Sequence, residues 1–187
     1  MDSWQELEQS CLNCEKCGLY STRKSVVFGV GNKNADIMLI GEGPGEQEDL
    51  QGQPFVGPAG KLLDDMLSII DLDRTKVYIA NIVKCRPPHN RDPQDEEQQA
   101  CIGYLRRQIQ LIQPKIIVCL GRIAARQIIY QEYKITKEHG LWINRDNIWY
   151  TAIYHPSALL RDLSKRPETF EDLLAIRTKM NDLGIRA

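Results

Sequence analysis

Long apolar runs are missing from this sequence of 187 residues. A membrane-spanning helix needs about 20 consecutive apolar residues, and no segment approaches that length. The first residues, "MDSWQELEQ", are acidic and polar, which is not typical of a secretory signal. A chain with 42% hydrophobic and 26% charged residues is typical of one globular domain of this size. We therefore expect a single domain over residues 1–187, cytoplasmic and monomeric.

An excess of positive charge is also missing, because 24 Lys and Arg residues face 25 Asp and Glu residues. Composition alone therefore does not indicate a nucleic-acid-binding protein, and such an interpretation has to rest on local clusters of basic residues. The chain does contain six cysteines. Without an export signal, six cysteines favour ligation of a metal or a cluster over a disulfide framework.

Four short apolar runs, at 36–40, 77–83, 115–120 and 149–154, predict the strands of a sheet. None alternates cleanly with polar residues, which is typical of strands buried on both faces of a parallel sheet. Helical patterns lie between and after them, at 60–70, 95–112, 122–130 and 169–183. This alternation predicts an α/β fold, a three-layer αβα sandwich around a central, mainly four-stranded parallel sheet.

Polar or glycine-rich residues follow every predicted strand. The first strand runs into "GEGPGE", the second carries Asn81, the third ends in Gly121 and Arg122, and the fourth ends in "HPS" at 155–157. Ligands of open parallel sheets bind at the carboxyl ends of the strands. We therefore expect Glu42, Asn81, Gly121 and His155 to be neighbours in a site.

The glycine-rich stretch does not match two common phosphate-binding motifs. Lys61 follows a glycine but precedes a leucine, so the P-loop pattern fails, and "GEGPGE" lacks the third glycine of a dinucleotide fingerprint. Alone, Gly-Glu-Gly would be a tight turn with an incidental acid. Its position opposite three other polar strand ends favours a functional role for Glu42.

Three further side chains fit recognition of a flat, polar ligand. Asn81 is unusual within a strand, and its amide offers both a donor and an acceptor to the edge of a base. Phe55, in the loop "QGQPFVGPAGK", is either a core anchor or a plate on which a base stacks. Pro156 and Ser157 fix His155 at a strand end, whereas His139 and His89 have the ordinary structural interpretation.

The cysteines offer a metal site whose identity the spacing leaves open. Cys14 and Cys17 form a CxxC pair, and Cys85 and Cys101 follow at long intervals. Cys11 precedes the pair by three residues and is a competing candidate. Four thiolates bind either Zn²⁺ or an iron–sulfur cluster. Cys119, within a predicted strand, is expected to be a small hydrophobic core residue.

Taken together, these segments resemble the family-four uracil-DNA glycosylases, the iron–sulfur branch of the uracil-DNA glycosylase superfamily. The matching segments are "GEGPGEQED", "GQPFVGPAGKLLD", "YIANIVKCRPPHNR", "IIVCLGRIA" and "YHPSALLR". The resemblance implies a hydrolase of base excision repair that flips uracil out of single- or double-stranded DNA and hydrolyses its N-glycosidic bond. It also implies a [4Fe–4S] cluster held by Cys14, Cys17, Cys85 and Cys101, within an N-terminal segment of about 11–25 and a loop and helix at 84–101. Cys11 departs from the usual pattern of the family.

The resemblance further implies a role for each site residue. Gly41 and Gly43 clear space for the uracil beside Glu42, which stabilises the sugar cation and orients or deprotonates the attacking water. His155 faces the uracil O2 and stabilises the departing anion. The remaining residues that hold the base are Asn81 at its O4 and N3 edge, Phe55 on its ring, and Glu48 against the position of a thymine methyl.

Contacts to DNA are expected from basic residues near the same rim. The expected contacts, including two small residues of the rim, are Lys84, Arg86, Arg91, Gly121, Arg122, Ser157 and Arg161, with Lys165 and Arg166 nearby. Leu159, four residues beyond His155, is expected to wedge into the stack that the flipped base leaves. Two alternatives remain open. One is a superfamily variant that binds an abasic site covalently through His89, and the other is a non-catalytic iron–sulfur protein that only binds nucleic acid.

Overall fold

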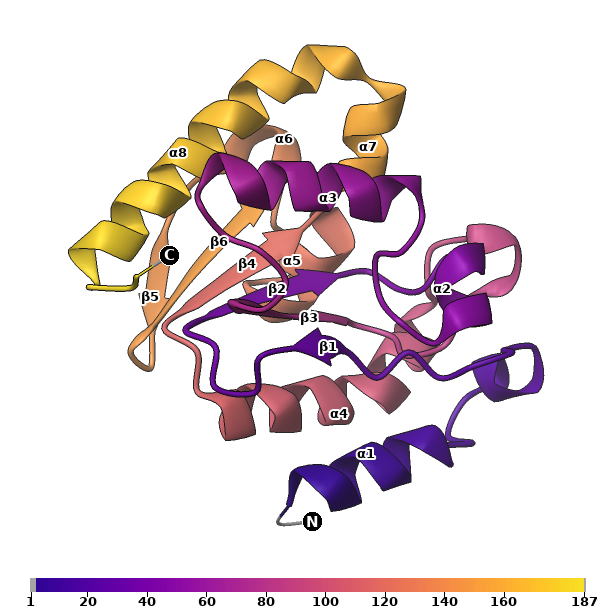
Figure 1. The fold of residues 1–187 in the computed structure, drawn as a ribbon. Coiled ribbons are helices and arrows are strands. Elements are labelled where there is room, and N and C mark those ends of the chain that lie inside the picture. Colours follow the sequence, from indigo (N-terminus) through magenta and orange to yellow (C-terminus); the bar gives the residue numbers. More distant parts are fainter. Residues whose placement is uncertain (1–2, 187) are drawn as a thin grey trace.

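The four predicted strands lie at the centre of one sheet in the computed structural model, which describes residues 3–186 (Figure 1). In the order β3-β2-β4-β6 these strands are parallel, and their bounds are Ile37–Gly41 (β2), Val77–Asn81 (β3), Ile116–Leu120 (β4) and Ile148–Ile153 (β6). Two short strands, β1 (Val30–Gly31) and β5 (Ile143–Arg145), add antiparallel edges beside β3 and β6. The prediction of a mainly parallel α/β sheet is confirmed, with two further strands.

The two edge strands escaped prediction because neither has a buried apolar run. β1 is two residues long and includes a glycine with φ of 126°, and most of β5 is exposed to solvent. The central strands, in contrast, bury both of their faces. In β2, Met38 and Ile40 belong to one core cluster and Ile37 and Leu39 to the other, which is the period of two that a strand imposes.

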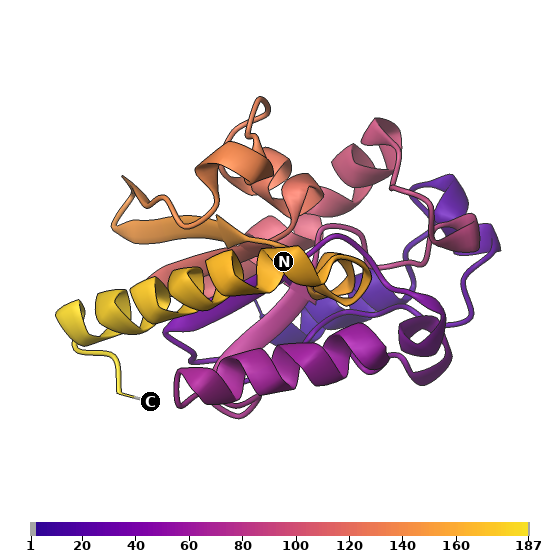
Figure 2. The ribbon, with the colours of Figure 1, turned by 90° about the horizontal axis from the view of Figure 1, so that it is seen from above.

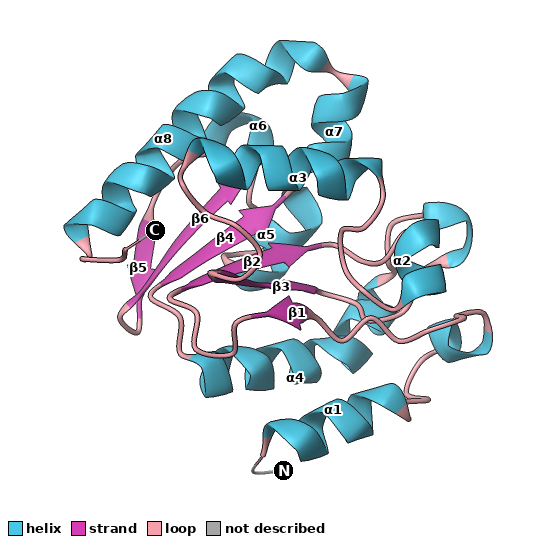
Figure 3. Ribbon diagram, viewed as in Figure 1, coloured by secondary structure: helices cyan, strands magenta, loops and turns pink. Residues whose placement is uncertain are grey.

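Helices cover both faces of the sheet and complete the three layers (Figures 2 and 3). One core cluster packs the sheet against α3 (Pro58–Ile69), α7 (Pro156–Arg161) and α8 (Arg166–Asp182). The other packs it against α1 (Trp4–Leu12), α4 (Asp95–Ile112) and α5 (Arg122–Ile128). Shorter helical segments are α2 (Glu46–Gln51), α6 (Ile135–Glu138), η1 (Gly18–Ser21), η2 (Pro88–Asn90) and η3 (Leu163–Lys165).

The order of the strands creates a crevice above β2. The chain leaves β2 through α3 to reach β3 on one side, and returns through α4 to β4 on the other side. Sheets of this kind bind ligands where the connections diverge, outside the carboxyl ends of the strands. Glu42 directly follows β2 and therefore lies at this point. No helix within residues 3–186 has the length and apolar character that crossing a membrane requires.

Candidate active site at the carboxyl edge of the sheet

One cavity of about 530 Å³ opens at the carboxyl ends of the four parallel strands. That volume is in the range of pockets that bind small ligands. The four residues expected to be neighbours all line it, namely Glu42, Asn81, Gly121 and His155. Other predicted site residues also line the cavity, namely Gly43, Glu48, Phe55, Arg91, Arg122, Ser157 and Arg161.

Glu42 is a half-buried carboxylate beside β3. Its backbone carbonyl accepts a hydrogen bond from the Val83 N–H at 3.1 Å, which continues the pairing of β2 with β3 beyond the strands. Burial raises the pKa of Glu42 from 4.5 to about 7. Asp92 raises it further, while the charges of Arg122 and Arg161 oppose the change. Proton affinity near neutrality suits a group that exchanges a proton with water.

Asn81 ends β3 with a polar atom that has no partner within the described chain. Its side chain is buried, and its Oδ1 accepts no hydrogen bond from residues 3–186. Such an unsatisfied buried oxygen costs about 1–3 kcal/mol unless a ligand supplies a donor. Gly41 is its register partner in β2. A Cβ at Gly41 would lie 2.4 Å from that Oδ1 and 2.7 Å from Cζ of Phe55, so only glycine leaves this space open.

Phe55 is held on the cavity wall by an unusual backbone. Its φ is 54°, which is rare for a residue with a side chain. Arg74 stabilises this conformation by donating to the carbonyls of Pro54 (3.0 Å) and Phe55, and its Nε pairs with Asp64 at 2.6 Å. A Cβ at Gly60 would lie 1.8 Å from the Phe55 carbonyl oxygen, so this close approach also requires glycine.

His155 is oriented by the start of α7. Its Nδ1 lies 3.1 Å from the Ser157 N–H, which donates to it, and 2.8 Å from Ser157 Oγ. A ring nitrogen that accepts from a backbone N–H carries no proton, so the neutral imidazole has its proton on Nε2. Burial, followed by the charge of Arg161, lowers the pKa of His155 to about 4, which keeps the ring neutral. The ring stacks on Phe55, with centroids 5.5 Å apart.

Glu48 is fixed by the backbone of two segments. Its Oε1 accepts from the N–H groups of Val56 (2.9 Å) and Gly57 (3.0 Å), and its Oε2 accepts from Gly45 at 3.1 Å. The carboxylate therefore ties α2 to the loop that carries Phe55. Its predicted contact with the C5 side of a base remains a prediction.

The basic residues around the cavity are mostly held by partners. Arg91 makes a bidentate pair with Glu97 at 2.7 and 2.8 Å, and Arg122 pairs with Asp92. The Nε of Arg86 donates to Asn90 at 2.8 Å. The other three are Arg161, which is exposed, Lys165, which pairs with Asp162, and Arg166, which donates to the Leu159 carbonyl.

Two predicted DNA contacts are wrong. Lys84 is 1% exposed and lies inside the protein, where its Nζ donates to the Phe28 carbonyl (3.0 Å) and Gln108 Oε1 (2.7 Å). Burial lowers its pKa to about 8. Leu159 is 2% exposed and packs in the core beneath α3, so it cannot enter a base stack from this position. Its neighbour Leu160 is 43% exposed.

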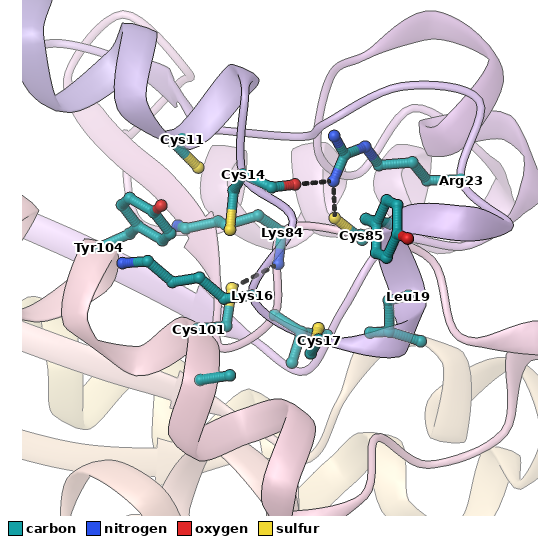
Figure 4. Close-up of a pocket in the computed structure, with 13 residues that line it drawn as sticks. Cys11, Cys14, Lys16, Cys17, Leu19, Arg23, Lys84, Cys85, Cys101 and Tyr104 are labelled. Atoms are coloured by element: carbon teal, nitrogen blue, oxygen red, sulfur yellow. Dashed lines mark hydrogen bonds between the residues drawn. The ribbon is translucent and has the colours of Figure 1, made fainter.

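A second, smaller cavity gathers five cysteines (Figure 4). It is lined by Cys11, Cys14, Cys17, Cys85 and Cys101, all of which are free thiols. Cys119 is buried in β4, in keeping with the prediction of a core residue. No group of three or more His, Cys, Asp or Glu side chains in residues 3–186 is arranged to hold a single metal ion.

Hydrogen-bond donors are directed at the sulfurs of this cavity. The Arg23 guanidinium lies 3.5 Å from Cys85 Sγ and also donates to the Cys14 carbonyl at 2.6 Å. The Lys84 backbone N–H lies 3.3 Å from Cys101 Sγ. Thiolates accept such hydrogen bonds better than thiols do, so the donor set fits a group that binds through deprotonated cysteines. Arg23 and Arg74 belong to no sequence motif, so sequence reasoning missed them. Their contacts are with groups that only the fold brings close to them.

The chain is similar in sequence to known proteins. The family model of the uracil DNA glycosylase superfamily matches residues 28–176. The chain is similar to the type-4 uracil-DNA glycosylase of Archaeoglobus fulgidus, with 43% identity over 94% of this chain and 92% of that protein. It is also similar to those of Sulfurisphaera tokodaii (44%, over 95% and 84%) and Thermotoga maritima (45%, over 81% and 80%). The chain therefore belongs to the uracil DNA glycosylase superfamily, in its type-4 branch.

Proposed function

We propose that this protein removes uracil from DNA by hydrolysing the bond between the base and the sugar, as a uracil-DNA glycosylase of base excision repair. Membership of the type-4 branch supports the activity. The unpaired Oδ1 of Asn81 at the floor of the cavity is the observation that carries the assignment of the site. It calls for a donor from a ligand, and the N3–H of a flipped uracil is such a donor.

Recognition of the base would involve Asn81 and Phe55. Asn81 Oδ1 accepts from N3–H, and its Nδ2 donates to O4, whereas cytosine presents an acceptor and an amine at these places. Phe55 stacks on the ring from one side. Glu48 is fixed by three backbone N–H groups and would meet a methyl group at C5 of the bound base. Both its immobility and its place on the cavity wall favour exclusion of thymine.

Departure of the base would be assisted by His155. Cleavage leaves negative charge on the uracil, and a neutral imidazole with its proton on Nε2 donates a hydrogen bond to O2 as that charge develops. The hydrogen bonds from Ser157 to Nδ1 hold the ring in this tautomer. Protonation of His155 is not required, because its pKa lies at about 4.

Glu42 would act on the opposite side of the broken bond. The sugar becomes cationic in the transition state, and a carboxylate beside it stabilises that charge. The same group can accept a proton from the water that attacks the sugar. Its pKa of about 7 makes it a better proton acceptor than an exposed glutamate would be.

The DNA would be held through its phosphates by exposed arginines of the rim. Arg161 lines the cavity and is exposed. Arg122 would leave Asp92, and Arg86 would leave Asn90, to bind phosphate oxygens instead. For the side chain that fills the gap in the base stack, we propose Leu160 in place of Leu159. It is exposed on the same helix as Arg161, whereas Leu159 belongs to the core.

A [4Fe–4S] cluster in the cysteine cavity is the cofactor that we propose. Cys14, Cys17, Cys85 and Cys101 would be its ligands, and the cluster would supply a covalent brace between the N-terminal segment and the loop after β3. Hydrolysis of an N-glycosidic bond transfers no electrons, so the proposed role is structural. Cys11 lines the same cavity and is the residue that could replace a ligand.

Substitutions separate the ligands from Cys11. Cys85→Ala should yield a colourless and poorly folded protein, whereas Cys11→Ala should keep its colour and iron content. A brown Cys85→Ala protein with full iron would refute the ligand set. Loss of iron from Cys11→Ala would show that Cys11 takes the place of Cys14 or Cys17.

One assay tests the activity against both alternatives. A uracil-containing oligonucleotide is incubated with the protein, and the product is treated with hot alkali. We expect strand breaks, which report an abasic site. A trapped protein–DNA adduct would indicate the covalent variant, although His89 is not among the described residues that line the cavity. Binding without any product would indicate a non-catalytic protein and overturn the proposal.

A further inference from the structure

Lys84 is a buried cation that the proposed reaction does not use. Its side chain is 1% exposed, and its hydrogen-bond partners, the Phe28 carbonyl and Gln108 Oε1, are uncharged. The Phe28 ring lies 5.8 Å away as a further weak partner. Within residues 3–186, no carboxylate accepts a hydrogen bond from this ammonium group. Burying an ammonium without an anion is costly, so the position requires an explanation.

The groups that can supply negative charge near Lys84 are cysteine thiols. Lys84 lines the cysteine cavity (Figure 4), and its backbone N–H is directed at Cys101 Sγ at 3.3 Å. A positive charge that is buried beside these thiols favours their thiolate form, which is the form that ligates metals.

We infer that Lys84 is the buried counter-charge of the metal cluster in the cysteine cavity, an inference that rests on the cofactor proposed above. An iron–sulfur core bound by four thiolates is negatively charged overall, because the thiolates outweigh the positive core. A cation inside the protein offsets that charge where water is excluded and electrostatic interactions are strong. Lys84 therefore acts as a positioning and tuning residue of the cluster, not as a DNA contact.

Arg23 differs from Lys84 in this respect. Its guanidinium also lies near a sulfur, but the residue is only half-buried and its first partner is the Cys14 carbonyl. Lys16 lines the cavity too, yet it is exposed and its Nζ lies over the Tyr104 ring at 4.7 Å. Solvent screens the charges of exposed residues. The strongest effect on the cluster is therefore expected from Lys84.

The test compares three variants of the full-length, cluster-loaded protein. Lys84→Met removes the charge and keeps a long side chain, Lys84→Arg keeps the charge, and Lys16→Met is the matched control from the rim of the same cavity. For each, we would measure iron and sulfide per chain, the midpoint potential of the cluster by voltammetry, and the rate at which a chelator extracts iron.

Lys84→Met should lower the midpoint potential, because a negatively charged cluster without its counter-cation accepts an electron less readily. Iron should leave it at least several-fold faster than from the parent. Lys16→Met should match the parent in both measurements, and Lys84→Arg should lie close to it. Changed packing alone could accelerate iron loss, but it does not predict a potential that falls with removal of the charge and returns with arginine.

Equal potentials in Lys84→Met and the parent would overturn the inference. If Lys84→Met retains no iron, the iron content of Lys84→Arg is the deciding measurement. A Lys84→Arg protein that holds the cluster supports the counter-charge role, and loss of iron from both variants overturns that role. A parent protein without iron would instead refute the cofactor proposal. Uracil excision by the parent is scored separately, so failure of the enzymatic function is distinguishable from both.

Discussion

Replacing Glu42 with glutamine should make the protein more stable while it removes most of the activity. The folded protein binds the Glu42 proton more tightly than the unfolded chain does, because burial raises the pKa from 4.5 to about 7. Well below pH 4.5 the residue is protonated in both the folded and the unfolded state, so it does not lower the free energy of unfolding. As the pH rises through 7, the folded state has to hold a half-buried charge. One unit of pKa corresponds to about 1.36 kcal/mol, so the cost approaches roughly 3 kcal/mol at pH 8.5.

Glutamine has nearly the same shape and no charge, so Glu42→Gln should recover much of that free energy at pH 8.5 and almost none at pH 4.5. Urea unfolding of the parent and the variant at both pH values measures this difference. Glu46→Gln is the matched control, since Glu46 is an exposed glutamate of the same segment. Single-turnover excision by Glu42→Gln should fall by about 10²–10³, the usual cost of one pre-organised electrostatic contact.

The parent enzyme should also lose activity as the pH falls below about 7, because protonated Glu42 neither stabilises a cation nor accepts a proton. His155 should not contribute to this decline, since its pKa lies at about 4. A stability gain of equal size at both pH values would refute the argument from burial. A variant that excises uracil at the parent rate would show that Glu42 is only a turn residue.

Four other substitutions test the base pocket, its support and the DNA wedge. Asn81→Asp should impair excision of uracil, because an ionised carboxylate cannot donate to O4, and weak excision of cytosine would be the diagnostic gain in a paired assay. Arg74→Met removes charged donors from the carbonyls of Pro54 and Phe55. We expect the free energy of unfolding to fall by about 1.5–3 kcal/mol and uracil excision to slow. A variant with unchanged excision would show that Phe55 needs no such support. Leu160→Ala should slow excision from duplex DNA more than from single strands at unchanged stability, whereas Leu159→Ala should cost about 2–5 kcal/mol of stability. The opposite pattern for the two leucines would return the wedge to Leu159.

The features predicted well from the sequence are those that follow from strand periodicity and topology. Runs buried on both faces indicated parallel strands, and parallel strands bring their carboxyl ends to one edge. Glu42, Asn81 and His155 were therefore expected together, and all three line one cavity. This inference needed no knowledge of side-chain conformations, because the backbone alone fixes the edge at which the residues lie.

The features predicted wrongly depend on which way a side chain points. Lys84 is close in sequence to Arg86, and we expected both on the rim, yet the chain after β3 directs Lys84 toward α4 and Gln108. Leu159 and Leu160 are adjacent and chemically identical. The short helix α7 buries the first and exposes the second. Arg74 could not be predicted at all, because it acts on carbonyl groups that carry no sequence signal.

The composition of the cysteine cavity has a consequence for synthesis of the protein. Cys11, Cys14 and Cys17 precede the first strand, but Cys101 lies in α4, after β2, α3 and β3. During synthesis, these three thiols therefore leave the ribosome well before the part of the cavity that contains Cys101 has been made. Metal captured at that stage would meet only the N-terminal part of the ligand set. For the cluster that we propose, delivery of iron after the first half of the sheet and α4 have folded would be the productive order, and until then the early thiols would stay open to oxidation.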